Sequence, residues 1–325
     1  MEQRGLQRVG RSVGVVGLGA WQLGADWGEI GDEDAAAVLD AALDAGVSFI
    51  DTADVYGDGR SERFCGELQK RHPGVMVATK MGRRVPQLPQ NYNRTAFAEW
   101  NSRSRENLGT RRIDLVQLHC PPSEVYDDDA VFAALDEMVD DGRIESYGVS
   151  VETCAQALAA IARPRVATVQ IILNCFRLKP LEAVLPAARA AGVGIIARVP
   201  LASGLLSGRY DEHTTFAPDD HRSFNRHGEA FDVGETFSGV DYDTALAAVE
   251  ELRLLVPEGA SMAQFALRWI LAFDAVTCAI PGGKRPAQVA DNCAASDLPP
   301  LREDTLRAVR AIYDARIRPT VHQRW

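Results

Sequence analysis

The chain has 325 residues and a mass of 35.4 kDa, enough for one large domain or two ordinary ones, and 46% of its residues are hydrophobic. Its 45 acidic residues outnumber its 35 basic residues, which gives a formal net charge of -10. That balance argues against nucleic acid or an anionic membrane as the main partner and favours a globular protein with a large core.

The first residues and the cysteines predict a cytoplasmic protein. Residues 1–5 lack the apolar core of a signal peptide, and no run approaches the length of about 18 apolar residues that a membrane span needs. The six cysteines form no CxxC pair, so we expect reduced thiols. The histidines and cysteines are not clustered at ligand spacing, so no metal site is expected.

The first apolar stretch, residues 13–20, is rich in glycine. A G-x-G-x-x-G dinucleotide template laid on residues 17–22 fails at its third glycine, and Trp21 is too bulky for the turn. The stretch therefore favours a strand that other backbone approaches closely. A Rossmann domain is disfavoured, although a nucleotide cofactor is not.

Helices and strands then alternate along the chain. Asp32 is expected to cap the first helix, which runs through Ala45 and ends at Gly46. Further helices are expected at 61–71, 94–108, 128–140, 152–162, 181–191, 244–255, 261–273, after Pro286, and at 303–317. Strands are expected at 47–50, 75–80, 113–118, 144–150, 166–173, 193–199 and 275–280.

We count eight strand–helix units after the first strand, with crossovers long enough for parallel strands. This pattern predicts a single domain, residues 1–325, folded as a (β/α)8 barrel with a short segment before the barrel. Long loops are expected at its carboxyl face. The longest, residues 200–241, is irregular and rich in Gly, Ser, Asp and His, as functional loops often are.

Three strands deliver polar side chains to the same rim of this barrel: Asp51, Lys80 and His119, with Tyr56 on the loop beside them. A phenol has a pKa near 10, which a nearby ammonium lowers, and a carboxylate can hold the ammonium in place. An imidazole can orient a carbonyl oxygen. The set suits protonation of an oxygen that becomes negative as hydride arrives at carbon.

Each of these residues also has a purely structural explanation. Asp51 could cap a helix, Tyr56 could pack its ring, Lys80 could be a solvated charge, and His119 could be a satisfied rim histidine. Taken singly, the structural explanation wins in each case. Four such residues at one rim favour catalysis.

The segments 51–57 (DTADVYG), 78–80 (ATK) and 117–119 (QLH) resemble the signature segments of the aldo-keto reductases, and the resemblance extends from Gly17 to Gly282. It implies an (α/β)8 barrel that binds NADPH without a Rossmann motif. It also implies that Tyr56 is the proton donor, with Lys80, Asp51 and His119 as its partners.

By the same resemblance, Ser150 and Gln170 hold the nicotinamide carboxamide. Many members have asparagine after that serine, where this chain has Val151, so one carboxamide contact is expected to be missing or replaced. Arg198 stands where many members stack an aromatic ring on the nicotinamide, and a planar guanidinium can stack there too.

The resemblance places three further segments beside the cofactor. Residues 200–208 lie along the pyrophosphate, and residues 280–292 receive the adenosine 2′-phosphate and the adenine. Two cations before a helix suit a dianionic phosphate, although an exposed basic pair is often merely solvated. The expected contacts are Gly19, Ala20, Trp21, Pro200, Leu201, Ser203, Leu205, Ser207, Gly282, Lys284, Arg285, Gln288 and Asn292. Some strongly NADPH-selective members have arginine in place of Gln288, so NADH remains possible.

The substrate pocket is expected to include Trp21, as a wall or as packing at the barrel mouth, and Met81. Met81 and Gly82 stand where some members carry a tryptophan, which indicates a roomier pocket. Loops at 83–93, 200–241 and 317–325 are expected to surround its opening.

The sequence therefore predicts an NADPH-dependent enzyme that reduces an aldehyde or ketone, a small-molecule carbonyl substrate. A cofactor-binding sensor or scaffold subunit on the same barrel is the alternative. A metal-dependent barrel hydrolase is a third, disfavoured by the missing ligand cluster. The substrate, the direction of the reaction and the oligomeric state stay open.

Overall fold

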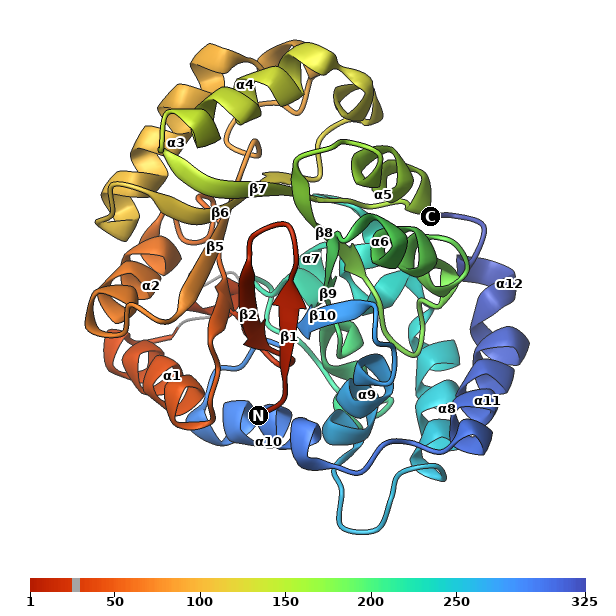
Figure 1. Ribbon diagram of the computed structural model, residues 1–325. Helices are drawn as coiled ribbons and strands as arrows, with labels where there is room; N and C mark the ends of the chain where they lie inside the picture. The colour runs from red at the N-terminus through yellow and green to blue at the C-terminus, as the bar shows by residue number, and fades with distance from the viewer. Residues whose placement is uncertain (25–29) are drawn as a thin grey trace.

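A computed structural model describes residues 1–24 and 30–325, which form a barrel of parallel strands ringed by helices (Figure 1). Eight strands, β3 to β10, are hydrogen-bonded in consecutive order. The ring closes where the first strand segment meets the last, through parallel bridges from Val16 to Ala279 and from Gly19 to Gly282. The predicted (β/α)8 barrel is confirmed.

The barrel strands are β3 (Leu18–Gly19), β4 (Phe49–Asp51), β5 (Met76–Met81), β6 (Ile113–His119), β7 (Ile144–Ser150), β8 (Val166–Ile172), β9 (Gly194–Arg198) and β10 (Val276–Ala279). We expected eight strand–helix units after the first strand, but among the described residues only seven barrel strands follow β3. The stretch 13–20 is divided, because its first part pairs in a hairpin while Leu18–Gly19 supplies the first barrel strand.

The helices are α1 (Asp32–Asp44), α2 (Arg60–Arg71), α3 (Arg94–Leu108), α4 (Asp129–Asp140), α5 (Cys154–Ile161), α6 (Val184–Ala191), α7 (His221–Phe224), α8 (Tyr242–Arg253), α9 (Met262–Leu271), α10 (Pro286–Ala294), α11 (Glu303–Ile312) and α12 (Arg318–Val321). Asp32 is the first residue of α1 and not its cap, since Gly31 holds the cap position without a side-chain hydrogen bond. The expected last helix, 303–317, becomes α11 followed by a π-helical turn, η9 (Tyr313–Ile317).

Short 3-10 turns complete the backbone. They are η1 (Trp21–Gly24), η2 (Pro89–Asn91), η3 (Ser123–Asp127), η4 (Lys179–Leu181), η5 (Ala202–Ser207), η6 (Val233–Glu235), η7 (Phe237–Gly239) and η8 (Ala295–Asp297). Three of them, η5, η6 and η7, lie with α7 in the irregular segment between β9 and α8.

A β-hairpin precedes the barrel and covers one of its ends (Figure 1). Its strands, β1 (Gln3–Leu6) and β2 (Arg11–Gly14), pair antiparallel. Leu6 and Val13 are buried in one cluster with barrel-interior side chains such as Met76. Arg4 donates to the carbonyls of Leu271 and Val276, each at 2.7 Å, so the hairpin is tied to the barrel wall.

The prediction that backbone closely approaches the first strand is confirmed. A Cβ on Gly17 would lie 2.7 Å from the carbonyl oxygen of Phe49, and one on Gly19 would lie 2.9 Å from that of Ile280. Both distances are too short for a side chain, so glycine is required for the barrel to close at this point.

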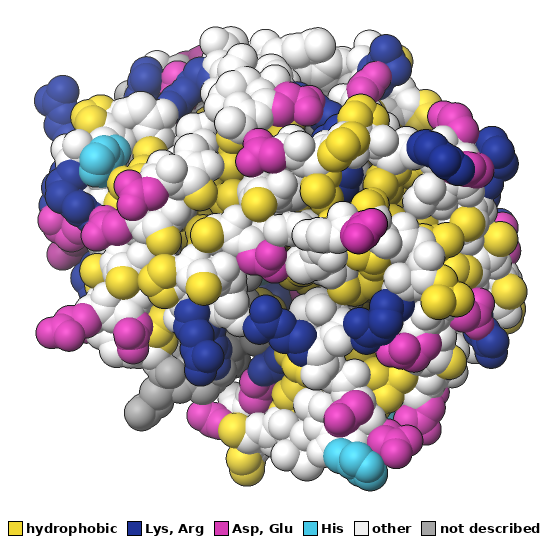
Figure 2. All heavy atoms as spheres, turned by 90° about the horizontal axis from the view of Figure 1, so that it is seen from below, with side chains coloured by type: hydrophobic (Ala, Val, Ile, Leu, Met, Phe, Trp, Pro, Cys, Tyr) yellow, Lys and Arg dark blue, Asp and Glu magenta, His cyan; other side chains and the backbone are white. Residues whose placement is uncertain are grey.

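The described residues can also be searched for disulfides, membrane-spanning helices and metal-ligand clusters. All six cysteines are free thiols. No helix in residues 1–24 and 30–325 has both the length and the apolar character needed to cross a bilayer. The same residues contain no group of three or more His, Cys, Asp or Glu side chains placed to hold a metal ion. Acidic and basic side chains are interspersed on the face shown in Figure 2.

Candidate active site

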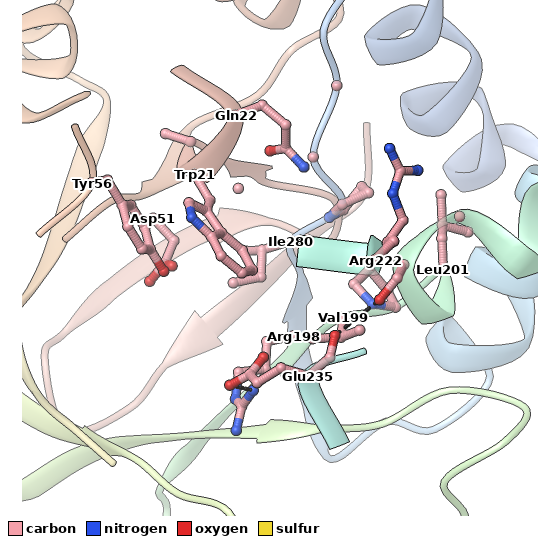
Figure 3. Close-up of a pocket in the computed structure, with 18 of the residues that line it drawn as sticks. Trp21, Gln22, Asp51, Tyr56, Arg198, Val199, Leu201, Arg222, Glu235 and Ile280 are labelled. Carbon is pink, nitrogen blue, oxygen red and sulfur yellow. Dashed lines mark hydrogen bonds and ion pairs between the residues drawn. The ribbon is translucent and has the colours of Figure 1, made fainter. Parts of the chain in front are cut away.

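A cavity of about 1020 Å³ opens at the carboxyl ends of the barrel strands (Figure 3). The strand ends contribute Asp51, Lys80, His119, Ser150, Gln170 and Arg198 to its lining. The rest of the lining comes from the turn after β3, the irregular segment after β9, and the segment between β10 and α10. This is the rim where active sites of such barrels lie.

Lys80 is the centre of the predicted tetrad. Its Nζ forms an ion pair with Asp51 and donates hydrogen bonds to the carbonyl of Thr52 at 3.0 Å and to Tyr56 Oη at 3.2 Å. Lys80 is 1% exposed and Asp51 is 3% exposed, so both charges are removed from water. Such a buried pair is stable only when its partners are well placed, as they are here.

The register of the strands explains why these side chains meet. Parallel pairing sets Asp51 beside Ala78 on β5, Lys80 beside Gln117 on β6, and His119 beside Ser150 on β7. Because parallel strands end at the same rim, Asp51 and His119, the last residues of β4 and β6, and Lys80, the last but one of β5, reach the same cavity.

Tyr56 is held by the rings around it. Trp21 stacks on it with centroids 5.8 Å apart, and His119 meets its edge at 6.0 Å. Gly57 follows with a φ of +57°, and any Cβ there would clash with the backbone of Gly24. The phenol ring is thereby fixed, with its hydroxyl beside Lys80.

Asp51 has a second set of partners that the sequence did not reveal. Its Oδ2 accepts hydrogen bonds from Gln117 Nε2 at 2.9 Å and from Gln170 Nε2 at 2.7 Å. Gln117 is a polar residue between the apolar Val116 and Leu118 and lies two positions before His119, so this position could have been recognised from the sequence. Gln170, expected at the nicotinamide, also helps to orient the carboxylate of Asp51.

Burial controls the protonation of Tyr56 and Lys80. Burial raises the pKa of Tyr56 above its usual value, and the opposing effect of Lys80 is smaller, so the expected net lowering does not occur. Burial would lower the pKa of Lys80, but Asp51 and then Tyr56 outweigh it and raise that pKa. Lys80 is therefore an ammonium and Tyr56 a neutral phenol with a proton to give.

His119 is a neutral imidazole at neutral pH. Burial, followed by the positive charges of Arg83, Lys80 and Arg198, lowers its pKa well below 6.5. A neutral ring can donate one hydrogen bond to a carbonyl oxygen and does not compete with Tyr56 as an acid. Its Nδ1 is buried without a hydrogen-bond partner among the described residues.

One charged residue beside the tetrad, Glu235, was not predicted from the sequence. Arg198 forms an ion pair with Glu235 and donates to the carbonyl of Val151 at 2.9 Å (Figure 3). Arg83 lies 3.5 Å from Glu152. The pairing of Glu235 with Arg198 could not be predicted, because Glu235 lies 37 positions after Arg198 in the irregular segment. The guanidinium of Arg198 is thus fixed by its own contacts at the position where the resemblance expects an aromatic ring.

Nearly all of the expected cofactor contacts line the cavity. They are Gly19, Ala20, Trp21, Ser150, Gln170, Arg198, Pro200, Leu201, Ser203, Ser207, Gly282, Lys284, Arg285, Gln288 and Asn292. Two expected residues, Met81 and Leu205, are not part of the lining, and each is 1% exposed. Met81 follows Lys80 in β5, so its side chain points to the opposite face of the strand and into the core.

Two cations, Lys284 and Arg285, stand directly before α10. Neither forms an ion pair within the described chain, although the charges of Asp220 and Asp219 partly oppose the lowering of the pKa of Lys284 by burial. Gln288 Oε1 accepts from the backbone N–H groups of Lys284 at 2.9 Å and Arg285 at 3.1 Å. The glutamine therefore shapes the turn, and two cations in this position could hold an anion such as a phosphate.

Comparison with known proteins gives a consistent result. The family model described as "Aldo/keto reductase family" matches residues 15–314. Aldo-keto reductase YhdN of Bacillus subtilis is 31% identical over 297 residues, which are 89% of this chain and 87% of that protein. A probable voltage-gated potassium channel subunit beta of Oryza sativa is 28% identical over 320 residues, 93% of each. The solved glycerol dehydrogenase AKR11B4 of Gluconobacter oxydans has a TM-score of 0.80 and 29% identity, covering 97% of this chain and 96% of that one.

Proposed function

The chain belongs to the aldo/keto reductase family, and from that premise we propose that it reduces an aldehyde or ketone to an alcohol, with NADPH as hydride donor and Tyr56 as proton donor. One observation carries the proposal most directly. The Nζ of Lys80 contacts both Asp51 and the hydroxyl of Tyr56 at the floor of the cavity.

The residues of the chain account for the proton side of the reaction. NADPH, when bound, supplies the hydride to the carbonyl carbon. The carbonyl oxygen would lie between the Tyr56 hydroxyl and His119, which both line the cavity. As that oxygen gains negative charge, Tyr56 gives it a proton, and the ammonium of Lys80 stabilises the phenolate that remains. Asp51 keeps Lys80 charged and in place.

The cavity lining fits the cofactor. Ser150 and Gln170 stand at the strand ends where the resemblance puts the carboxamide. The pyrophosphate would follow the segment 200–208, and the 2′-phosphate would meet Lys284 and Arg285, which form no ion pair within the described chain. Because those two cations can read the 2′-phosphate, NADPH should bind more tightly than NADH, although NADH remains usable.

The substrate would be a small carbonyl compound with an apolar part. Trp21 forms a wall of the cavity, with its ring 5.9 Å from Phe231. The glycerol dehydrogenase similar to this chain acts, by its name, on a small polyol. A panel should therefore cover small hydroxyaldehydes, dicarbonyls and aromatic aldehydes.

The direct test mixes the protein with NADPH and each compound of that carbonyl panel, and measures the consumption of NADPH from its absorbance. The proposal expects turnover with at least one compound, an alcohol as product, and a slower reaction with NADH. If no compound is reduced, the enzymatic assignment is contradicted.

The alternative is a cofactor-binding sensor or scaffold subunit, favoured by the similarity to proteins named as potassium channel subunits. Rapid mixing of the NADPH complex with the same compounds separates the two functions. No oxidation of the bound NADPH by any compound would favour the sensor, whereas oxidation by at least one compound, repeated over many turnovers when excess NADPH is added, favours the enzyme.

A further inference from the structure

Residues 231–239, here called the wall segment, form one side of the cavity. Phe231, Asp232 and Glu235 line it. Phe231 meets the edge of Trp21, which in turn stacks on Tyr56, and Glu235 forms the ion pair with Arg198. The position of the wall segment therefore sets the shape of the space beside the proton donor.

The wall segment has a strained backbone. Phe237 and Ser238 have φ values of +52° and +59°, in the left-handed region, and Gly239 follows at +72°. Each non-glycine residue in this region is unfavourable unless its surroundings hold it there. Part of the support comes from η5: Ser203 Oγ donates to the carbonyl of Glu235 at 2.9 Å and accepts from the N–H of Phe237 at 3.1 Å.

Asn174 and Asn225 also donate to the side chains of Ser238 and Thr236, at 2.8 Å and 3.1 Å, and a further support comes from the far end of the sequence. The indole Nε1 of Trp325 donates to the carboxylate of Asp232, at 3.1 Å and 3.2 Å from its two oxygens. The same ring lies against Gly234 and Gly239, where any Cβ would crowd or clash with it. The guanidinium of Arg177 lies 3.7 Å from the ring centroid.

Trp325 is 7% exposed and does not line the cavity. It therefore cannot touch a substrate, and any effect on the reaction has to pass through the wall segment. A hydrogen bond to a charged acceptor is among the stronger ones in proteins. The stacked Arg177 fixes the ring that makes it.

We propose that Trp325 is a positioning residue for substrate binding: it holds Asp232, and with it the wall segment, in the orientation that shapes the cavity. This inference rests on the proposed function, because a substrate-binding role requires a carbonyl substrate. The holding of the wall segment itself can be measured without turnover.

The test uses Trp325→Phe, which keeps an aromatic ring over Arg177 but loses the N–H donor. Asp232→Ala and the double variant complete a cycle. Tyr313→Phe is the matched control, since it removes the 2.9 Å hydrogen bond between Tyr313 and His322 near the same end of the chain without touching the wall segment.

Two readouts are needed. Hydrogen exchange of the amides in 231–239 should become about tenfold faster in Trp325→Phe and stay unchanged in Tyr313→Phe. The KM for the preferred carbonyl should rise about fivefold to tenfold, with kcat and the Kd for NADPH within about twofold of the unaltered chain. In the Asp232→Ala background, Trp325→Phe should have no further effect on KM.

Unchanged exchange in Trp325→Phe would overturn the proposal, as would faster exchange with an unchanged KM. Additive effects of the two substitutions would overturn the route through Asp232. If the unaltered chain reduces no carbonyl, the proposed function fails, while the exchange measurement still decides whether Trp325 holds the wall segment.

Discussion

A lysine that is 1% exposed carries a charge at the centre of the cavity because a carboxylate lies against it. Asp51 in turn accepts from two buried amides, Gln117 and Gln170, so the acid has a fixed position. Burial raises the pKa of the neighbouring phenol, Tyr56, so this phenol keeps its proton at neutral pH. In the proposed reaction, the ammonium is needed most at the moment when the phenolate forms.

Lys80→Met should for this reason lower kcat on the order of a hundredfold or more, because the phenolate would form in a buried site without a counter-charge. The Kd for NADPH, measured by fluorescence titration, should change little. Lys70→Met is the matched control, since Lys70 pairs with Glu67 on the exposed face of α2. Equal kcat values in Lys80→Met and Lys70→Met would contradict the role of Lys80.

At the scale of elements, the buried strands could be predicted within a residue or two. β5, β6, β7 and β8 are buried along nearly their whole length, and such strands read as continuous apolar runs. Helix starts were less accurate. α5 begins two residues later than expected because Thr153 and Gln156 form a capping box.

What the sequence could not show depends on contacts between distant segments. The stretch 13–20 is divided between two sheets because β2 pairs with β1, and local periodicity carries no information on such pairing. In the site, the tetrad was predictable because each member follows a recognisable strand. Glu235 and Trp325 were not, since their partners are set by how the irregular segment and the last residues fold back.

The start of α10 is the element on which cofactor choice should depend. Replacing both Lys284 and Arg285 by alanine removes two charge-assisted contacts to a 2′-phosphate, which should weaken NADPH binding by roughly tenfold to a hundredfold. NADH lacks that phosphate, so its Kd is the internal control and should stay the same. An equal loss for both cofactors would contradict the assignment of this helix start to the phosphate.

The described residues form a closed barrel with one end covered by the hairpin (Figure 1), and the cavity lies at the carboxyl ends of its strands. A charged side chain that is buried near the site reduces the stability of the fold unless it is paired. Asp54, close to the tetrad, is fully buried, and burial followed by the charge of Glu62 raises its pKa to about 7 from its ordinary value of 3.8.

The raised pKa of Asp54 predicts that the free energy of unfolding depends on pH. Between its unfolded and folded pKa values, the folded chain binds more protons, so the free energy of unfolding should fall as pH rises through that window. Asp54→Asn should remove this loss and be more stable than the unaltered chain above about pH 7, by at most about 4 kcal/mol. The difference should shrink toward about pH 5, as measured by urea unfolding. Asp44→Asn, at an exposed position, is the control, and a pH-independent difference would contradict the prediction.

The account depends most on the hydroxyl of Tyr56, and one comparison tests it. Steady-state reduction of the best carbonyl substrate by the unaltered chain and by Tyr56→Phe should differ by about two to four orders of magnitude in kcat, while the Kd for NADPH stays within about twofold. Turnover by Tyr56→Phe close to that of the unaltered chain would contradict the assignment of the proton donor.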